Sequence, residues 1–151
     1  MNIKNHITQI IKNNNTKSFL NNSLSLDTID KVFDENKPIM VSIICNTYNH
    51  EKYIASCLDG FLMQKVNFNV EILIHDDAST DNTQGIIKEY EKKYPRIIRP
   101  IYQKNNQLSK GINFTSVYQY PRIRGKYVTF CEGDDCFIDE FKLFLQFEFL
   151  E

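Results

Sequence analysis

Three acidic side chains fall within four residues near the carboxyl end of the chain, in the run Glu132-Gly133-Asp134-Asp135. Carboxylates this close repel one another unless a positive group lies among them. Hard oxygen ligands on a tight turn suit Mg²⁺ or Mn²⁺, which keep coordination positions open for the phosphate oxygens of a substrate. We therefore predict a divalent metal ion bound by Glu132, Asp134 and Asp135, where it would neutralise a diphosphate leaving group. The alternative is a solvated acidic turn.

A second acidic pair, Asp76-Asp77, directly follows the apolar run at residues 70–75. The carboxylate of Asp77 is able to accept hydrogen bonds from a nucleobase or a ribose. Helix capping is the alternative role for this region, because Asp76, Ser79, Thr80 and Asp81 are all good capping residues. Both roles can hold at once for different residues.

A third polar cluster, Asn46-Thr47-Tyr48, follows the apolar run at residues 39–45. The ring of Tyr48 offers a flat surface on which a base can stack, and its hydroxyl group remains able to form a hydrogen bond. Loop packing is the alternative. The sequence identifies no partner for His50 or His75, and we assign neither of them a role.

The elements that position these clusters follow from the apolar pattern. Short β-branched runs at 39–45, 70–75 and 127–131 predict strands that are buried on both faces. The run at 97–102 is weaker, and Pro100 makes it an edge strand or an irregular piece. Apolar residues at helical spacing predict helices at 51–64, before Pro95, at 112–120 and at 140–151, with Asn49 as the cap of the first of these.

This alternation of strands and helices predicts an α/β fold with a Rossmann-like, mainly parallel sheet that is flanked by helices. Ligands of such sheets bind outside the carboxyl ends of the strands. The three polar clusters all follow predicted strands, so we expect them to meet at one edge of the sheet. That convergence is the basis of the functional prediction.

Residues 1–36 are rich in Asn, Lys and Ser and contain no Gly or Pro. We expect them to form two short amphipathic helices or a partly ordered arm, before one domain at 37–151. The formal net charge of −1 argues against general binding of nucleic acid. The cysteines form no C-x-x-C pair, and buried free thiols in a cytoplasmic protein are the expectation.

The chain resembles the family 2 inverting glycosyltransferases of the GT-A fold, over residues 38–151. The resemblance is carried by the segments 41–49, 71–83 and 125–128, and by Cys131-Glu132-Gly133-Asp134-Asp135. The last is similar to the C-E-G-D-D form of the metal-binding motif found in bacterial polysaccharide and cell-surface enzymes. Together and in this order, the motifs are far more specific than any one of them.

The resemblance implies roles for single residues. Asn46 and Tyr48 match positions that line the nucleotide pocket, and Asp77 matches the acid that contacts the base or ribose. Asp134 and Asp135 match acids that contact the ribose and coordinate the metal, while Glu132 stands where many members carry the first Asp. Lys110 lies where the usual Gly-rich stretch is missing and is a candidate contact to the diphosphate.

The resemblance also implies the reaction, a direct displacement with inversion from a nucleoside-diphosphate sugar, such as a UDP-sugar, to a glycan or lipid-linked acceptor. A cytoplasmic protein at the inner face of the membrane, associated at most peripherally, fits that chemistry. The general base is expected beyond residue 151, so no catalytic residue is assigned and the domain is expected to be the nucleotide-binding half. The alternatives are a non-catalytic nucleotide-binding fragment of this fold and, less favoured, a phosphoacceptor receiver domain.

Overall fold

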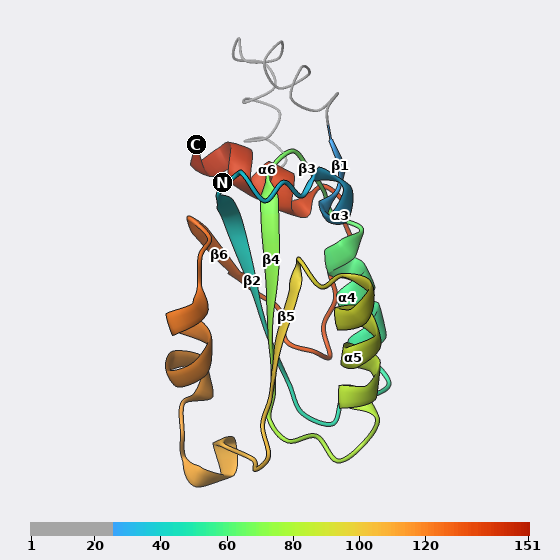
Figure 1. The fold of residues 1–151 in the computed structure, drawn as a ribbon, viewed down its shortest axis with the longest axis vertical. Coiled ribbons are helices and arrows are strands. Elements are labelled where there is room, and N and C mark those ends of the chain that lie inside the picture. The colour runs from blue at the N-terminus through green and yellow to red at the C-terminus, as the bar shows by residue number, and fades with distance from the viewer. Residues whose placement is uncertain (1–25) are drawn as a thin grey trace, which may run out of the picture.

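Four parallel strands at the centre of the molecule form its main sheet, in the order β5-β4-β2-β6 (Figure 1). The computed structural model describes residues 26–151. The strands are β2 (Ile39–Thr47), β4 (Asn69–Asp76), β5 (Ile98–Tyr102) and β6 (Tyr127–Phe130). The predicted mainly parallel α/β architecture is confirmed.

The two central strands are the ones with continuous apolar runs. β4 is buried along its whole length, and β2 is buried from Val41 to Thr47. β5 lies at one edge, as Pro100 predicted. The prediction that the last strand is buried on both faces is wrong, because Val128 and Phe130 are 40% and 51% exposed. Within residues 26–151, β6 pairs only with β2 and leaves its other edge open.

Two helices, α4 (Ile54–Leu62) and α5 (Thr83–Lys93), lie side by side on one face of the sheet (Figure 1). Their apolar residues join those of the strands in one core, which includes Ile43, Phe61, Ile72 and Ile87. The burial of apolar surface in this core is the main force that holds the helices on the sheet.

The first helix begins three residues later than predicted, and Asn49 does not cap it, because Tyr53 occupies the cap position. Asn49 has a positive φ of 56°, and its side-chain oxygen accepts a hydrogen bond from the backbone N–H of Thr80 at 2.8 Å. A contact with the loop after β4 therefore replaces the predicted local cap.

The opposite face of the sheet is covered by the segment that follows β5, shown in orange in Figure 1. It contains the 3₁₀ turns η1 (Leu108–Lys110) and η3 (Tyr120–Arg122) and the π-helix η2 (Thr115–Gln119). The predicted α-helix at 112–120 is thus replaced by a π-helix. Pro121, which lacks an N–H group, prevents its continuation as a regular helix. The buried amide of Gln119 donates to the backbone carbonyls of Cys45 and Leu73 at 3.2 and 3.1 Å.

Two further parts pack at the end of the sheet where the strands begin. Helix α6 (Lys142–Leu150) confirms the helix predicted at 140–151. The short strands β1 (Asp27–Thr28) and β3 (Lys65–Val66) pair in antiparallel fashion, and α3 (Ile29–Val32) follows β1. Ile29 is fully buried in the core, so this part of the predicted N-terminal arm packs on the domain. Residues 1–25 of that arm lie outside the described residues.

The boundary predicted between residues 36 and 37 stays a prediction. Within residues 26–151, no helix combines the length and apolar character needed to cross a bilayer.

Candidate functional site

The loop after β4 and the acidic turn after β6 both attach to the end of β2. The backbone N–H of Asp77 donates to the carbonyl of Thr47 at 3.0 Å, and the N–H of Gly133 donates to the carbonyl of Asn46 at 2.9 Å. Two neighbouring residues therefore hold the two acidic loops on either side of one strand end. The expected convergence of the three polar clusters at one edge of the sheet is confirmed.

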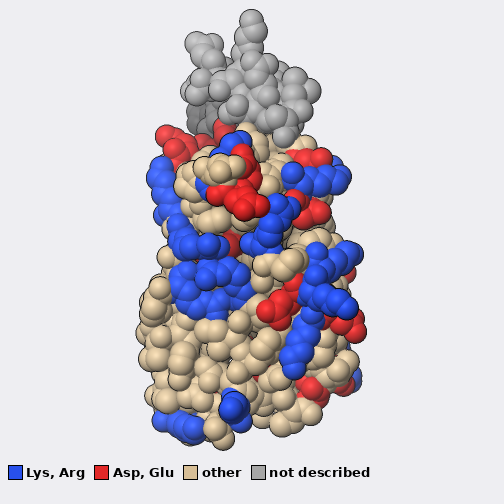
Figure 2. Space-filling view, viewed as in Figure 1, with Lys and Arg blue, Asp and Glu red and all other residues tan. Residues whose placement is uncertain are grey.

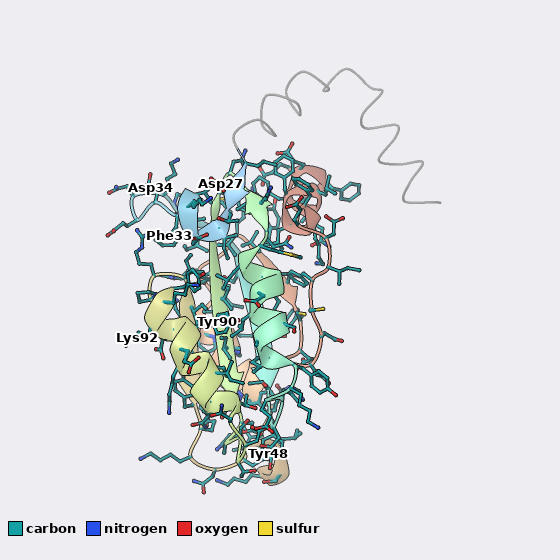
Figure 3. The ribbon with its side chains drawn as sticks, turned by 90° about the vertical axis from the view of Figure 1, so that its right-hand side faces the viewer. Asp27, Phe33, Asp34, Tyr48, Tyr90 and Lys92 are labelled. Carbon is teal, nitrogen blue, oxygen red and sulfur yellow. The ribbon has the colours of Figure 1, made fainter. Side chains whose placement is uncertain are left out.

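A cleft opens at this edge, and its walls come from all three clusters and from the segment after β5. Figure 3 shows Tyr48 at the end of the molecule opposite Asp27 and Asp34. The ring of Tyr48 is 43% exposed and so is free to receive a flat ligand. The lining residues are Asn46, Thr47, Tyr48, His50, Asp77, Asn106, Leu108, Phe114 and Glu132.

Asp77 is almost completely buried, and both of its carboxylate oxygens already have partners. Oδ1 accepts the backbone N–H of Gln107 at 2.6 Å, and Oδ2 accepts that of Leu108 at 3.0 Å. Asp77 therefore fixes the loop that carries Asn106 and Leu108 into the cleft. Its predicted contact with a base or ribose stays a prediction.

Asp76 and Asp81 form local hydrogen bonds around the start of α5, but the predicted helix capping by these residues is not seen, because Asn82 occupies the cap position and no side-chain cap hydrogen bond forms. Asp76 Oδ2 accepts the N–H of Ser79 at 3.0 Å and the amide of Gln84 at 2.6 Å. Asp81 Oδ1 accepts the N–H of Thr83 at 2.9 Å, in the first turn of α5. These contacts fix the loop after β4, so Asp76 and Asp81 have local structural roles.

Asn46 joins the π-helix to the cleft. Its amide nitrogen donates to Thr115 Oγ1 at 3.1 Å, and its oxygen accepts from the amide of Gln119 at 3.4 Å. The amide of Asn46 also lies beside Glu132 and favours the ionised form of its carboxylate. A ligand in the cleft would thus contact the side chain of Asn46, whose orientation is set by the π-helix η2.

The acidic turn is closed by a hydrogen bond from the N–H of Asp135 to the carbonyl of Glu132 at 3.0 Å. Desolvation raises the pKa of Glu132 above its usual value, and the neighbouring carboxylates of Asp134 and Asp135 add to this effect. Asp134 Oδ2 lies 3.9 Å from His50 Nε2. Asp134 and Asp135 are exposed on the turn, and neither of them lines the cleft.

Gly133 explains how the turn lies so close to β2. A Cβ atom at this position would fall 2.6 Å from Thr47 Oγ1 and 3.0 Å from His50 Nδ1. The absence of a side chain at Gly133 therefore allows a close approach of the turn to protein atoms of β2 and the loop after it. Thr47 Oγ1 and His50 Nδ1 are both buried without a hydrogen-bond partner, so the turn covers two unsatisfied polar atoms.

The predicted metal ligands lie together on this turn, but among the described residues no three His, Cys, Asp or Glu side chains form a complete cage for an ion. Mg²⁺ is usually held by one or two carboxylates together with substrate phosphates rather than by an all-protein cage. The exposed carboxylates of Asp134 and Asp135 on one turn are the kind of oxygen donor that such a shared ion takes. The metal site itself stays a prediction.

Lys110 is the last residue of η1 and is exposed. It lies two residues after Leu108, which lines the cleft, but it is not a lining residue itself. Its contact with a diphosphate stays a prediction.

Several lining residues were not assigned from the sequence, and His50 and Phe114 are the most informative. The sequence identifies no partner for His50, whereas the structure places its Nδ1 atom beside Gly133 and its Nε2 atom 3.9 Å from Asp134 Oδ2. Phe114 stacks on the buried ring of His75, with ring centroids 4.7 Å apart and planes 6° apart. Neither contact has a local signal, because the partners lie far apart in the sequence.

Three buried thiols lie beneath the acidic turn. Cys45 Sγ and Cys57 Sγ form no disulfide and share a hydrogen bond at 4.0 Å, and Cys57 Sγ donates to the carbonyl of Glu132 at 3.5 Å. Burial raises the pKa of Cys131 to about 12. The expectation of buried free thiols is confirmed for these three residues, while Cys136 is exposed.

Comparisons with known proteins agree on one family. The sequence profile described as "Glycosyl transferase family 2" matches residues 42–151. The chain is 44% identical over 111 residues to "Uncharacterized protein Rv1520" of Mycobacterium tuberculosis, which covers 74% of this chain and 31% of that protein. It is 38% identical over 96 residues to "Uncharacterized glycosyltransferase EpsJ" of Bacillus subtilis, covering 64% of this chain and 26% of the relative.

Solved structures agree on the fold. TarS of S. aureus in complex with UDP superposes with a TM-score of 0.62 at 29% sequence identity, over 74% of this chain and 32% of TarS. A mannosyltransferase of Pyrobaculum calidifontis in complex with GDP-Man and Mn²⁺ has a TM-score of 0.55 at 20% identity, over 69% of this chain and 30% of that one. The second likeness shows the fold alone.

The aligned region spans between 26% and 32% of the length of these four proteins. The sheet order, the strand-end cleft and the likeness to TarS identify the GT-A, Rossmann-like fold. The receiver-domain alternative is excluded by the family match. On the match over residues 42–151 and the identity to its relatives, the chain belongs to glycosyl transferase family 2.

Proposed function

We propose that this chain binds the nucleotide-sugar donor of a glycosyltransferase that acts in the synthesis of a polysaccharide or cell-surface glycan. The observation that carries the proposal is the single cleft into which Asn46, Tyr48, Asp77 and Glu132 open from three separate strand ends. Strand ends of this kind are where open α/β sheets bind their ligands. The proposed location is the cytoplasm, at the inner face of the membrane.

The proposed donor is a UDP-sugar. TarS, which is similar to this chain, was solved with UDP and with UDP-GlcNAc. The exposed ring of Tyr48 would stack on the base, and the loop held by Asp77 would surround the base and ribose. Stacking on an aromatic ring would supply most of the apolar contact, and hydrogen bonds would supply the selectivity.

The proposed cofactor is Mn²⁺ or Mg²⁺, held by Asp135 and Asp134 with Glu132. When bound, such an ion neutralises the charge that develops on a departing diphosphate. The chain itself would present the three carboxylates on one turn. Gly133 allows that turn to pack closely against Thr47 and His50.

The proposed reaction is direct displacement at the anomeric carbon, with inversion, by a hydroxyl group of a glycan or lipid-linked acceptor. A carboxylate that deprotonates that hydroxyl group is expected outside the residues present here. Donor binding and activation of the leaving group are the steps that this chain would supply.

Isothermal titration of UDP in the presence of Mn²⁺ tests the donor and metal proposals together. We expect the wild-type chain to bind UDP in a Mn²⁺-dependent way, and Asp135→Ala to lose that dependence with little change in thermal stability. Glu140→Gln is the control, because this acid lies beyond the turn and pairs with Lys65 at 3.3 Å. Affinity equal to wild type in Asp135→Ala would contradict the metal site.

Turnover needs a separate assay, because a binding module would share every contact described above. Release of free UDP from a UDP-sugar in the presence of acceptors supports transfer by this chain. Binding of UDP without any release supports the non-catalytic alternative.

A further inference from the structure

A second charged site lies on the same sheet face as the π-helix, away from the strand-end cleft. Its centre is Glu71, a fully buried carboxylate on the central strand β4. Glu71 Oε1 accepts from Ser42 Oγ at 2.7 Å and from the backbone N–H of Arg124 at 2.9 Å. These bonds and those of two guanidinium groups outweigh its desolvation and hold its pKa below the usual value. Glu71 is therefore a fixed negative charge.

Two arginines, Arg99 and Arg124, bind this one carboxylate, and a third, Arg122, lies beside them. Arg99 Nη1 and Arg124 Nε both donate to Glu71 Oε2 at 2.7 Å, and Arg124 Nη2 lies 2.6 Å from the same oxygen. The guanidinium group of Arg122 donates to the backbone carbonyl of Arg99. Three positive charges thus face one negative charge, which leaves an excess of two positive charges.

A structural role accounts for Arg99 and Arg124, since a buried carboxylate needs such partners. It does not account for Arg122, which pairs with no acidic side chain in the part of the chain that the structure describes. Burial and the nearby charge of Arg99 lower the pKa of Arg122, and the charge of Glu71 offsets this only in part, so the charged state of Arg122 is opposed by its surroundings. An anion at this point would remove that cost.

The arginines also remain accessible. The side chains of Arg99 and Arg124 are 36% and 50% exposed, and Arg122 is half-buried. Figure 2 shows Lys and Arg side chains gathered on this face, over the middle of the sheet. A guanidinium group presents five N–H donors. Among residues 26–151, Arg99 and Arg122 each use only one nitrogen for a protein acceptor.

From this juxtaposition we propose that Arg99, Arg122 and Arg124 form a binding site for a phosphate group, separate from the donor cleft. Planar guanidinium forks match the geometry of phosphate oxygens, and several of them around one point favour a multiply charged anion over a carboxylate. The phosphate could belong to a lipid headgroup or to a soluble phosphate ester, and the same arginine contacts would serve both.

An NMR titration of the 151-residue chain with inorganic phosphate tests the site, in EDTA, without nucleotide and at constant ionic strength. We expect saturable shifts at the amides of residues 99 and 122–124. Arg122→Gln should weaken binding about tenfold, because one charge-assisted contact is lost. Glu71 keeps its two arginines in this variant, so the fold should persist. If this variant does not fold, Arg122→Lys replaces it, with a smaller loss expected.

Arg96→Gln is the matched control, since it removes the same charge from an exposed arginine whose nearest acid is Glu35 at 4.0 Å. Phosphate affinity should not change in this variant, and UDP affinity with Mn²⁺ should not change in Arg122→Gln. Equal losses in both arginine variants, equal shifts with acetate, or no saturable shifts in the wild type would overturn the site. A parallel loss of UDP binding in Arg122→Gln would assign the phosphate to the donor cleft and would also overturn it.

Sedimentation with vesicles separates the two sources of phosphate. Arg122-dependent sedimentation with vesicles of phosphatidylcholine and phosphatidic acid, but not with phosphatidylcholine alone, identifies a lipid headgroup. Saturable binding of inorganic phosphate without sedimentation identifies a soluble phosphate ester. Either result supports the phosphate site, and neither depends on the proposed sugar transfer.

Discussion

The carboxylate of Asp77 accepts a hydrogen bond from the backbone N–H of Gln107 at 2.6 Å, in a buried position thirty residues away along the chain. Its other oxygen accepts the N–H of Leu108. Asp77 follows a central strand, whereas Gln107 and Leu108 lie in the loop after an edge strand. One side chain therefore determines where the segment after β5 enters the cleft, which gives Asp77 a positioning role beside its predicted contact with the donor.

Asp77→Asn should reduce the free energy of unfolding by about 1–3 kcal/mol, because the amide has one oxygen and must leave one buried backbone N–H unpaired. UDP affinity should fall as well, since the loop lines the cleft. Urea denaturation and isothermal titration measure the two effects. Asp59→Asn is the control, because its oxygen can still accept the hydroxyl of Tyr90. A stability of Asp77→Asn equal to that of the wild type would contradict the positioning role.

Gly133→Ala should displace the acidic turn, because a Cβ atom there meets Thr47 Oγ1 at 2.6 Å and His50 Nδ1 at 3.0 Å. The expected cost is about 1–3 kcal/mol of stability, as for other overpacked sites, with weaker Mn²⁺-dependent UDP binding. The cause is steric, since Gly133 does not have a positive φ. If stability falls but UDP binding is unchanged, the close packing of the turn against Thr47 and His50 does not matter for the ligand.

Ala78→Gly should stabilise the protein. Ala78 has a φ of 64°, in the left-handed region that costs a non-glycine residue roughly 1–2 kcal/mol. Part of that gain is lost to the greater freedom of glycine in the unfolded chain, so a net gain of about 0.5–1 kcal/mol is expected in urea denaturation.

Gly111→Ala is the reciprocal variant, with a φ of 71° and open space around the missing Cβ atom. A loss of about 1 kcal/mol is expected from the backbone alone. If the free energy of unfolding changes in the same direction in Ala78→Gly and Gly111→Ala, backbone strain is ruled out as the cause of the two changes.

His75→Phe should weaken the pH dependence of stability. Burial lowers the pKa of His75 below its usual 6.5, and the nearby carboxylates of Asp77 and Asp76 oppose this only in part. As the pH falls, His75 therefore takes up its proton in the unfolded chain before it does so in the folded protein. The stability that the neutral, buried His75 contributes is full above about pH 6.5 and is lost as the pH falls toward the folded pKa. The measurement is the free energy of unfolding of both proteins between about pH 7 and about pH 5. If the free energy of unfolding of the wild type and of His75→Phe depends on pH in the same way, His75 is not the source of the pH dependence.

His75 also offers a check on packing. Phenylalanine keeps the stacking on Phe114 and Tyr118 and removes the buried Nδ1 atom, which has no partner. The hydrogen bond with Gln103 is lost at the same time. We therefore expect a stability at neutral pH within about 1 kcal/mol of the wild type, since the two effects oppose each other.

Much of the fold could be read from the sequence, because its signals are local. Continuous β-branched runs predicted β2 and β4, and Pro100 predicted the edge position of β5. Polar clusters directly after the runs predicted a site at the carboxyl edge, since parallel strands bring their ends together. The core and the place of the cleft were therefore already determined at the level of short segments.

Only the tertiary structure decided the contacts between distant segments. The exposure of β6 depends on how many neighbours that strand has, which no run of residues records. Three features depend on residues far apart in the chain. They are the packing of the π-helix on the sheet, the close approach of Gly133 to His50, and the loop that Asp77 holds. Glu71 gathers Arg99 and Arg124 from 28 and 53 residues away. Such contacts arise from the packing of the whole domain, because no local pattern specifies which distant residues will meet.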